Sequence, residues 1–216
     1  MQRAARSSNE HSARRDLERV AKRAMDIAGA SVGLVAFGPV MGAAALAVRA
    51  TMGSPVLFRQ VRPGLHGEPF TILKLRTMIE ASTDQPDAVR LTRLGKLLRS
   101  TSVDELPQFW NVLRGDMSLV GPRALLMEYL PLYSPRHARR HEVKPGLTSW
   151  VAVHGRNTVS WEDQFEMDVW YVENQSLWLD LKILAMTVAK VLARDGVTQE
   201  GRATRDPFTG LAPEPG

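Results

Sequence analysis

The chain has 216 residues, of which 44% are hydrophobic and 24% are charged, a composition typical of a folded protein and not of a disordered one. Its net charge is +5, and the first 23 residues hold seven Lys or Arg against three Asp or Glu, so we expect an anionic partner: phosphate, lipid headgroup or nucleic acid. The absence of cysteine excludes disulfides and thiolate metal sites.

An uncharged run of 22 residues, 27–48, follows the basic N-terminal segment 1–23. At ~1.5 Å per residue it is long enough to cross a hydrocarbon core of roughly 30 Å, so we expect a membrane helix over 24–50. Gly38 and Pro39 lie at its middle, where proline removes a backbone hydrogen bond and kinks a helix. Basic residues flank both ends, and the positive-inside rule places both flanks at the cytoplasmic face. We therefore favour a re-entrant helix that bends at Gly38-Pro39.

Three other interpretations of this run stay open. A straight transmembrane helix tolerates a proline. A cleaved signal peptide is suggested by the A-x-A pattern at 45–47, although the run exceeds the usual apolar region of roughly 7–15 residues. A buried core helix would need an unusually long uncharged stretch.

The residues after the run predict a β-hairpin and an amphipathic helix. Segments 56–61 and 69–76 read as two strands joined by turn residues, and 79–90 reads as a polar loop. Leucines at 91, 94, 97 and 98 mark one face of a helix whose other positions are basic. This pattern is typical of an interfacial helix on an anionic bilayer, and equally of a soluble helix packed on a core.

The C-terminal half predicts further helices. Segment 124–141 should begin as a helix, break at Pro131 and Pro135, and end in a basic cluster. We favour a solvated basic face over a metal site at His137 and His141, because no HEXXH glutamate is present. Segment 147–153 is expected to be extended or irregular. The expected fold class is α+β, mainly helical, with one folded domain over 51–200 after the apolar run. Two further helices are expected at 161–171 and 177–192, and a disordered tail is expected at 201–216.

Two adjacent carboxylates, Asp104 and Glu105, are the clearest candidates for chemistry. One interpretation is structural, because Ser102 and Glu105 fit a capping box and Asp104 could itself be a helix N-cap. The other is functional: a carboxylate at a helix N-terminus beside Arg99 should stay ionised and could act as a nucleophile or a metal ligand towards a phosphoryl group. An apolar stripe is predicted to follow, at positions 106, 109, 110 and 113.

The stretch LRSTSVDELPQFWNVLRGDMSLVGPR closely resembles the central signature of the monotopic phosphoglycosyl transferases, a bacterial sugar transferase family that starts lipid-linked glycan assembly. The resemblance extends through SPVLFRQVRPGLHGEPFTILKLRTM upstream and through VKPGLTSW, GRN and DVWYVENQSLWLDLKIL downstream. It covers residues 20–195 approximately.

The resemblance implies a reaction in two halves. Asp104 would attack the β-phosphate of a UDP-sugar, release UMP and carry a covalent phosphosugar, which polyprenyl phosphate would then accept. Glu105 matches the family's Mg²⁺ ligand, and Lys74, Arg99 and Arg123 match its cations near the diphosphate. The resemblance also implies that 51–200 is a cytoplasmic catalytic domain, held at the cytoplasmic face of a bacterial inner membrane. The implied further partner is anionic lipid, and nucleic acid is not expected to bind. The sugar, the pathway and the oligomeric state, including a homo-oligomer, stay open.

Two rival functions remain at this point. A non-catalytic, membrane-tethered scaffold of a polysaccharide export system would keep the fold, but the intact Asp104-Glu105 pair argues against it. A basic nucleic-acid-binding protein would leave the apolar run at 27–48 unexplained.

Overall fold

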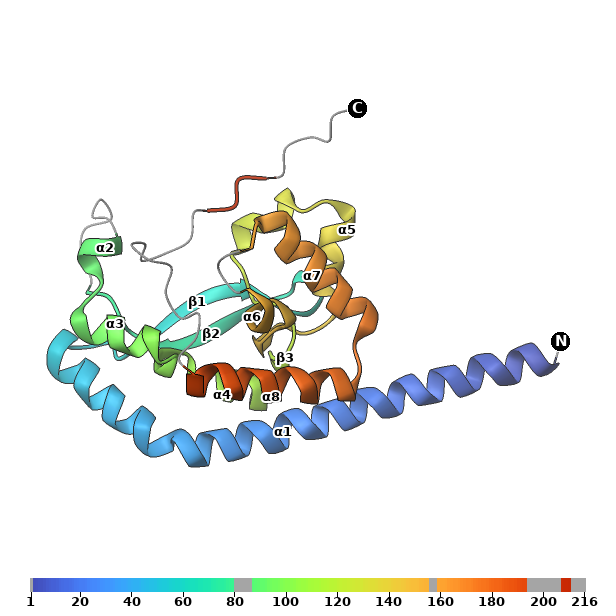
Figure 1. Ribbon diagram of the computed structural model, residues 1–216, viewed down its shortest axis with the longest axis horizontal. Helices are drawn as coiled ribbons and strands as arrows, with labels where there is room; N and C mark the ends of the chain where they lie inside the picture. The colour runs from blue at the N-terminus through green and yellow to red at the C-terminus, as the bar shows by residue number, and fades with distance from the viewer. Residues whose placement is uncertain (1, 80–86, 156–158, 194–206, 211–216) are drawn as a thin grey trace.

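The computed structural model describes residues 2–79, 87–155, 159–193 and 207–210. A long helix runs along one side of a mainly helical domain that contains two small sheets (Figure 1). In chain order the elements, with short 3₁₀ turns labelled η, are α1 (Gln2–Met52), β1 (Leu57–Pro63), η1 (Leu65–Gly67), β2 (Pro69–Leu75), α2 (Asp87–Arg90), α3 (Arg93–Ser100), η2 (Val103–Glu105), α4 (Gln108–Arg114), β3 (Ser118–Val120), η3 (Met127–Leu132), α5 (Pro135–Ala138), η4 (Arg139–Glu142), β4 (Gly146–Thr148), α6 (Trp150–His154), α7 (Trp161–Asn174) and α8 (Leu177–Ala193).

Helix α1 joins the predicted basic segment and the predicted membrane helix into one continuous element. Pro39 lies inside it, and no atom comes within 4 Å of a Cβ built on Gly38. Figure 1 shows that the helix is bent along its length. The section Leu17–Met52 has a mean hydropathy of 1.9 over its most apolar window, of which 17% is buried in the protein. So little burial disfavours the core-helix interpretation.

The section of α1 before the apolar run is fastened to the domain by charged side chains. The Lys22 ammonium lies 2.6 Å from the fully buried carboxylate of Asp180, which also accepts a 2.6 Å hydrogen bond from Tyr171. Arg23 donates to the carbonyls that end α4, at 2.6 Å each. We expected Lys22 and Arg23 to be flanking charges of the membrane helix. They do flank it, and the structure shows in addition that both bind within the protein.

The apolar run itself touches the domain at both of its ends. Close to its start, Asp26 accepts hydrogen bonds of 2.9 Å from the side chain of Ser118 and the backbone of Leu119. Near its other end, Val48 is fully buried in a cluster with Leu75 of β2 and Leu98 of α3. Both ends of the run therefore rest on the same folded unit.

The C-terminus of α1 is closed by a residue that the sequence did not single out for this role. The buried Arg76 guanidinium donates to the carbonyls of Met52, the last residue of α1, and of Gly53 and Ser54, which follow it. Helix ends leave such carbonyls without intrahelical partners, so Arg76 satisfies them. It also ties the end of α1 to the end of β2.

The predicted hairpin is confirmed. Strands β1 and β2 pair antiparallel with Leu57 opposite Leu75 and Pro63 opposite Pro69. The second sheet, the parallel pair of β3 and β4, was not predicted from the sequence. Helices α7 and α8 confirm the two helices expected in the C-terminal half.

The leucine helix is shorter and more involved in packing than predicted. Leu91 forms a β-bridge with Met78, and α3 begins after Thr92, whose hydroxyl accepts from the Gly95 amide at 2.9 Å. Leu98 is buried and Leu94 packs beside it against α1. Leu97, in contrast, is 59% exposed, so the leucines do not share one face towards a bilayer.

Other segments differ from the expectations. Segment 124–141 is interrupted as predicted, and α5 begins at Pro135, but the helix expected at its start is the 3₁₀ turn η3, which contains Pro131. Segment 147–153 includes helix α6, which Ser149 caps by accepting from the Ala152 amide. The predicted disordered tail lies outside the described residues except at 207–210. There Phe208 is buried against Tyr129 and Phe165, so these four residues pack on the domain.

Gly95 offers a test of the packing between α3 and the strand end. A Cβ on Gly95 would overlap the backbone carbonyl of Thr77, whereas a Cβ on Gly42 of α1 would meet nothing within 4 Å. We expect Gly95→Ala to lower the free energy of unfolding by about 1–3 kcal/mol, as overpacking does. Gly42→Ala should be neutral or slightly stabilising. Denaturation of both detergent-solubilised variants measures this, and equal stabilities would contradict the packing described.

Candidate functional site

The two carboxylates lie on a short turn between α3 and α4. Ser102 has a left-handed backbone (φ 55°) and makes no capping hydrogen bond through its side chain, and η2 follows directly. Helix α4 begins later, at Gln108, after Pro107. Neither Asp104 nor Glu105 therefore caps a helix, and the structural interpretation of this pair is wrong.

Glu105 is held between two cations from distant parts of the chain. Lys74 of β2 places its ammonium 2.7 Å from Glu105 Oε1, and Arg123, in the loop after β3, places its guanidinium 3.0 Å from the same oxygen. The Glu105 side chain is 15% exposed. Charge-assisted hydrogen bonds of this kind fix both position and orientation. The carboxylate thus joins the hairpin, η2 and the loop after β3.

Asp104 is buried beside this ion-pair network and has an unusual acidity. Burial, and then the neighbouring Glu105 charge, raise the pKa of the Asp104 carboxyl to about 6, while Lys74, Arg99 and Arg123 counteract the rise. We expected a helix N-terminus to keep this carboxyl ionised, but the groups that favour its ionised form are the three cations. At neutral pH Asp104 is mainly a carboxylate, held ionised by the surrounding cations and only poorly solvated.

Arg99 approaches Asp104 from the last turn of α3. Its Nε donates to the Thr77 hydroxyl at 3.0 Å, just beyond β2, and its charge reaches Asp104. The structure therefore brings together every side chain that the sequence nominated for the phosphate chemistry. The set comprises Lys74, Arg99, Asp104, Glu105 and Arg123. Gly38 and Pro39, the other nominated residues, lie in the apolar section of α1, away from this set in the sequence.

The loop that carries Arg123 rests on a buried ion pair that the sequence analysis missed. Arg140, 2% exposed, donates to the Arg123 carbonyl at 2.8 Å and to the fully buried Asp168 carboxylate at 2.7 and 3.0 Å. Asp168 shares the buried face of α7 with Phe165 and Val169. An acid at an apolar helical position needs a buried partner, and this signal was available in the sequence.

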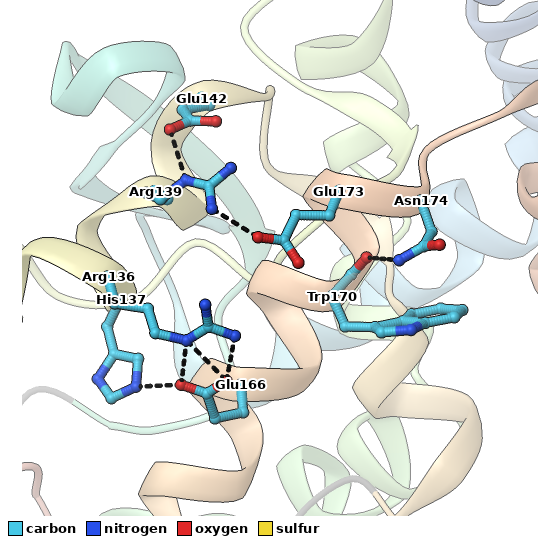
Figure 2. Close-up of polar contacts among 8 residues, drawn as sticks. All are labelled: Arg136, His137, Arg139, Glu142, Glu166, Trp170, Glu173 and Asn174. Carbon is cyan, nitrogen blue, oxygen red and sulfur yellow. Dashed lines mark hydrogen bonds and ion pairs between the residues drawn. The ribbon is translucent and has the colours of Figure 1, made fainter.

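The segment around Arg140 is consequently not the solvated basic face that we expected. His137 and His141 are buried as well, and burial lowers the pKa of His141 to about 4. Only the outer arginines face solvent: Arg136 pairs with Glu166 at 2.7 Å and Arg139 pairs with Glu173 at 2.5 Å (Figure 2). These contacts fasten α5 and η4 to α7.

A buried amide links α4 to the strand that carries Lys74. Asn111 accepts from the Leu73 amide at 3.1 Å and donates to the Thr71 carbonyl at 2.8 Å. The fully buried residues of α4 are Gln108, Asn111 and Val112, while Phe109 and Leu113 of the predicted apolar stripe are half-buried and pack against the core. Trp110, also in the stripe, is 52% exposed. The stripe is therefore confirmed only in part, because the hydrogen bonds of Asn111 bury another face of the helix.

The donor set suits a hard cation bound with help from substrate. Among the described residues no group of three or more His, Cys, Asp or Glu side chains could hold a metal by itself. Mg²⁺ is commonly held by one or two carboxylates together with substrate phosphates and water. Glu105 fits that mode, because it offers carboxylate oxygens beside Asp104 at the rim of the cation cluster.

Comparison with known proteins places this geometry in a family. Residues 17–194 match the family described as Bacterial sugar transferase. The chain is 53% identical over 195 residues to "Uncharacterized sugar transferase EpsL" of Bacillus subtilis, covering 88% of this chain and 96% of the relative. It is 43% identical over 189 residues to the UDP-glucose:undecaprenyl-phosphate glucose-1-phosphate transferase of Caulobacter vibrioides, covering 81% and 70%.

A transferase of the same name from Escherichia coli is 39% identical over 188 residues, which cover 81% of this chain and 40% of the relative. That alignment covers less than half of the longer protein. The family match at residues 17–194 includes the apolar section of α1 and the whole cation cluster. Because the family match and these alignments cover most of its length, the chain belongs to the bacterial sugar transferase family.

Proposed function

We propose that this protein is a phosphoglycosyl transferase that moves a sugar phosphate from a UDP-sugar to polyprenyl phosphate, the first membrane step of a bacterial glycan pathway. The observation that carries the proposal is the buried Asp104 beside Glu105, within reach of the charges of three cations. The named activities of the relatives from Caulobacter vibrioides and Escherichia coli support the substrate class.

The first half of the proposed reaction forms an ester on Asp104. One carboxylate oxygen attacks the β-phosphorus of the UDP-sugar, the bond from that phosphorus to the bridging oxygen breaks, and UMP leaves with the electron pair. In the second half a phosphate oxygen of polyprenyl phosphate attacks the same phosphorus. The bond to Asp104 breaks, the carboxylate is regenerated, and polyprenyl diphosphate sugar is released.

The cations make the first attack electrostatically feasible. An anionic nucleophile must approach an anionic diphosphate, so positive charge has to offset the repulsion as the phosphoryl group transfers. Lys74 and Arg123 are held in place by Glu105, and Arg99 by Thr77, so these charges are ordered before substrate arrives. Mg²⁺ held by Glu105 would add charge neutralisation at the diphosphate.

We further propose that α1 enters and leaves the bilayer on the cytoplasmic side. A helix that crossed the membrane would separate the two ends of the apolar run by roughly 30 Å of hydrocarbon. Asp26 and Val48, close to the two ends, both bind the same domain instead. Between them α1 exposes apolar side chains suited to lipid, namely Val32, Val35, Phe37, Val40 and Leu46.

Replacing the proposed nucleophile tests the reaction directly. We expect Asp104→Asn to lower turnover by roughly 10³-fold or more, because the amide cannot form the ester. Incubation of wild-type protein with donor alone should add the mass of a sugar phosphate to the peptide containing Asp104, by mass spectrometry. Glu162→Gln, on an exposed acid of α7, is the matched control and should keep both signals. Full turnover without any adduct at Asp104 would refute the covalent route.

Metal dependence is tested by chelation and by the adjacent carboxylate. We expect EDTA to abolish UMP release and Mg²⁺ to restore it. Glu105→Gln should raise the Mg²⁺ concentration for half-maximal activity by at least about tenfold, since even outer-shell partners of a metal contribute that much. If activity survives chelation unchanged, Mg²⁺ takes no part in the reaction, and only Lys74, Arg99 and Arg123 offset the charge of the diphosphate.

Single cysteines test the topology without background, since the chain has none. Leu17→Cys and Val61→Cys replace exposed residues on either side of the apolar run, and Val35→Cys replaces one within it. A membrane-impermeant maleimide should label positions 17 and 61 only from the cytoplasmic side, and should not label position 35. Labelling of position 17 or 61 in intact spheroplasts would establish a spanning helix.

A further inference from the structure

The face of the hairpin that carries Lys74 continues past the cation cluster. In the antiparallel register Phe58 lies opposite Lys74 and Arg62 lies opposite Phe70. Directly paired residues, and alternate residues along a strand, share one face of a sheet. Arg62 therefore projects from the same face as Lys74, four residues closer to the hairpin tip, which is about 13 Å along the strand at ~3.3 Å per residue.

Arg62 is half-buried and its charge is poorly matched. Its Nη2 donates to the neutral amide oxygen of Gln60 at 2.5 Å, while its Nε is buried without a hydrogen-bond partner. Within the part of the chain that the structure describes, no carboxylate lies at ion-pair distance from it. Removing a guanidinium from water without a counter-ion is unfavourable, so this side chain is suited to an anion from outside the chain.

The neighbour of Arg62 is a second arginine. Burial and the positive charge of Arg123 lower the pKa of Arg62, and Glu128 offsets this only in part, without an ion pair. Pro63 and Gly64, which follow Arg62, line one open hollow together with Arg123 and the buried His141. Glu105 pairs with Arg123, whereas among the described residues no carboxylate pairs with Arg62. The positive charge therefore continues from Lys74 and Arg123 to Arg62, which Glu105 does not pair with.

We propose that Arg62 and Arg123 form a second phosphate subsite, next to the phosphate that Asp104 attacks. This rests on the function proposed above, which brings two sources of phosphate to the site: the nucleotide and the lipid carrier. Planar guanidinium groups bind phosphate oxygens through paired hydrogen bonds, and an anion between two of them relieves their mutual repulsion.

The direction of the hairpin favours the nucleotide as the occupant. Leu57 and Leu75, at the open end of the hairpin, pack against the end of α1, where the lipid phosphate would arrive. Arg62 lies at the opposite end, where the tip contacts η4 away from α1 (Figure 1). The subsite is therefore assigned to the nucleotide phosphate that is released in UMP, and Arg62 is a substrate-positioning residue of the first half-reaction.

The test uses the full-length protein in detergent or nanodiscs. Arg62→Gln removes the charge, and Arg62→Lys keeps the charge but loses the planar guanidinium that makes paired hydrogen bonds. Arg59→Gln is the matched control, on an exposed arginine of the same strand whose side chain lies on the other face. Four quantities are measured for each: KM for the UDP-sugar, the inhibition constant of UMP, KM for polyprenyl phosphate, and the unfolding midpoint.

We expect Arg62→Gln to raise the first two quantities by roughly 10- to 100-fold, as the loss of a charge-assisted hydrogen bond does. KM for polyprenyl phosphate should not change, Arg62→Lys should be intermediate, and Arg59→Gln should match the wild type. If Arg62→Gln does not fold, the comparison of Arg62→Lys with Arg59→Gln decides the question.

Two results would overturn the inference. If the Arg62 variants match Arg59→Gln in all constants, Arg62 binds no phosphate. If KM for polyprenyl phosphate rises and UMP inhibition does not change, the subsite belongs to the lipid and the nucleotide assignment is wrong. A wild-type protein that releases no UMP from any UDP-sugar would instead refute the proposed function, and this is known before any variant is compared.

Discussion

The Glu105 carboxylate holds three separate parts of the chain in one place. Lys74 comes from β2, Glu105 from η2, and Arg123 from the loop after β3, and their side chains meet at 2.7 and 3.0 Å. Without this acid the two cations would repel each other at short range. Asp104 lies next to the arrangement, so its burial is tolerated and its carboxyl keeps a pKa of about 6. The proposed nucleophile therefore lies directly beside positive charge that Glu105 holds in place.

The supports behind this arrangement are polar and buried. Arg140 and Asp168 hold the Arg123 loop, Asn111 holds the strand that carries Lys74, and Arg76 closes the end of α1. Such groups cost free energy when they are removed from water, and each makes hydrogen bonds with a defined direction. Apolar packing would fill the same space with less control over the loops. The domain therefore positions its charges through hydrogen-bonded polar groups behind them.

The long helix α1 and the proposed catalytic residues are part of the same folded unit. Lys22 and Asp26 bind the domain before and at the start of the apolar run, and Val48 binds it near the end. The domain is thereby held against both ends of the apolar run. For the proposed reaction between a soluble nucleotide and a lipid phosphate, this arrangement would place the cation cluster within reach of both reactants. In that proposal the cations from Lys74 to Arg62, which extend away from the end of α1, would hold the nucleotide.

Local patterns in the sequence determined the hairpin, α7, α8 and the apolar α1, because period-2 and helical spacings and uncharged length are properties of neighbouring residues. The resemblance to the family nominated Asp104 and the residues that the fold gathers around it. Only the tertiary structure decided that this pair does not cap a helix, that Lys22 binds Asp180, and that Arg140 is buried. Lys22 and its partner Asp180 are 158 residues apart in the sequence, and Arg140 and its partner Asp168 are 28 residues apart. Whether a charge can be buried depends on such a distant group, which no local pattern reveals.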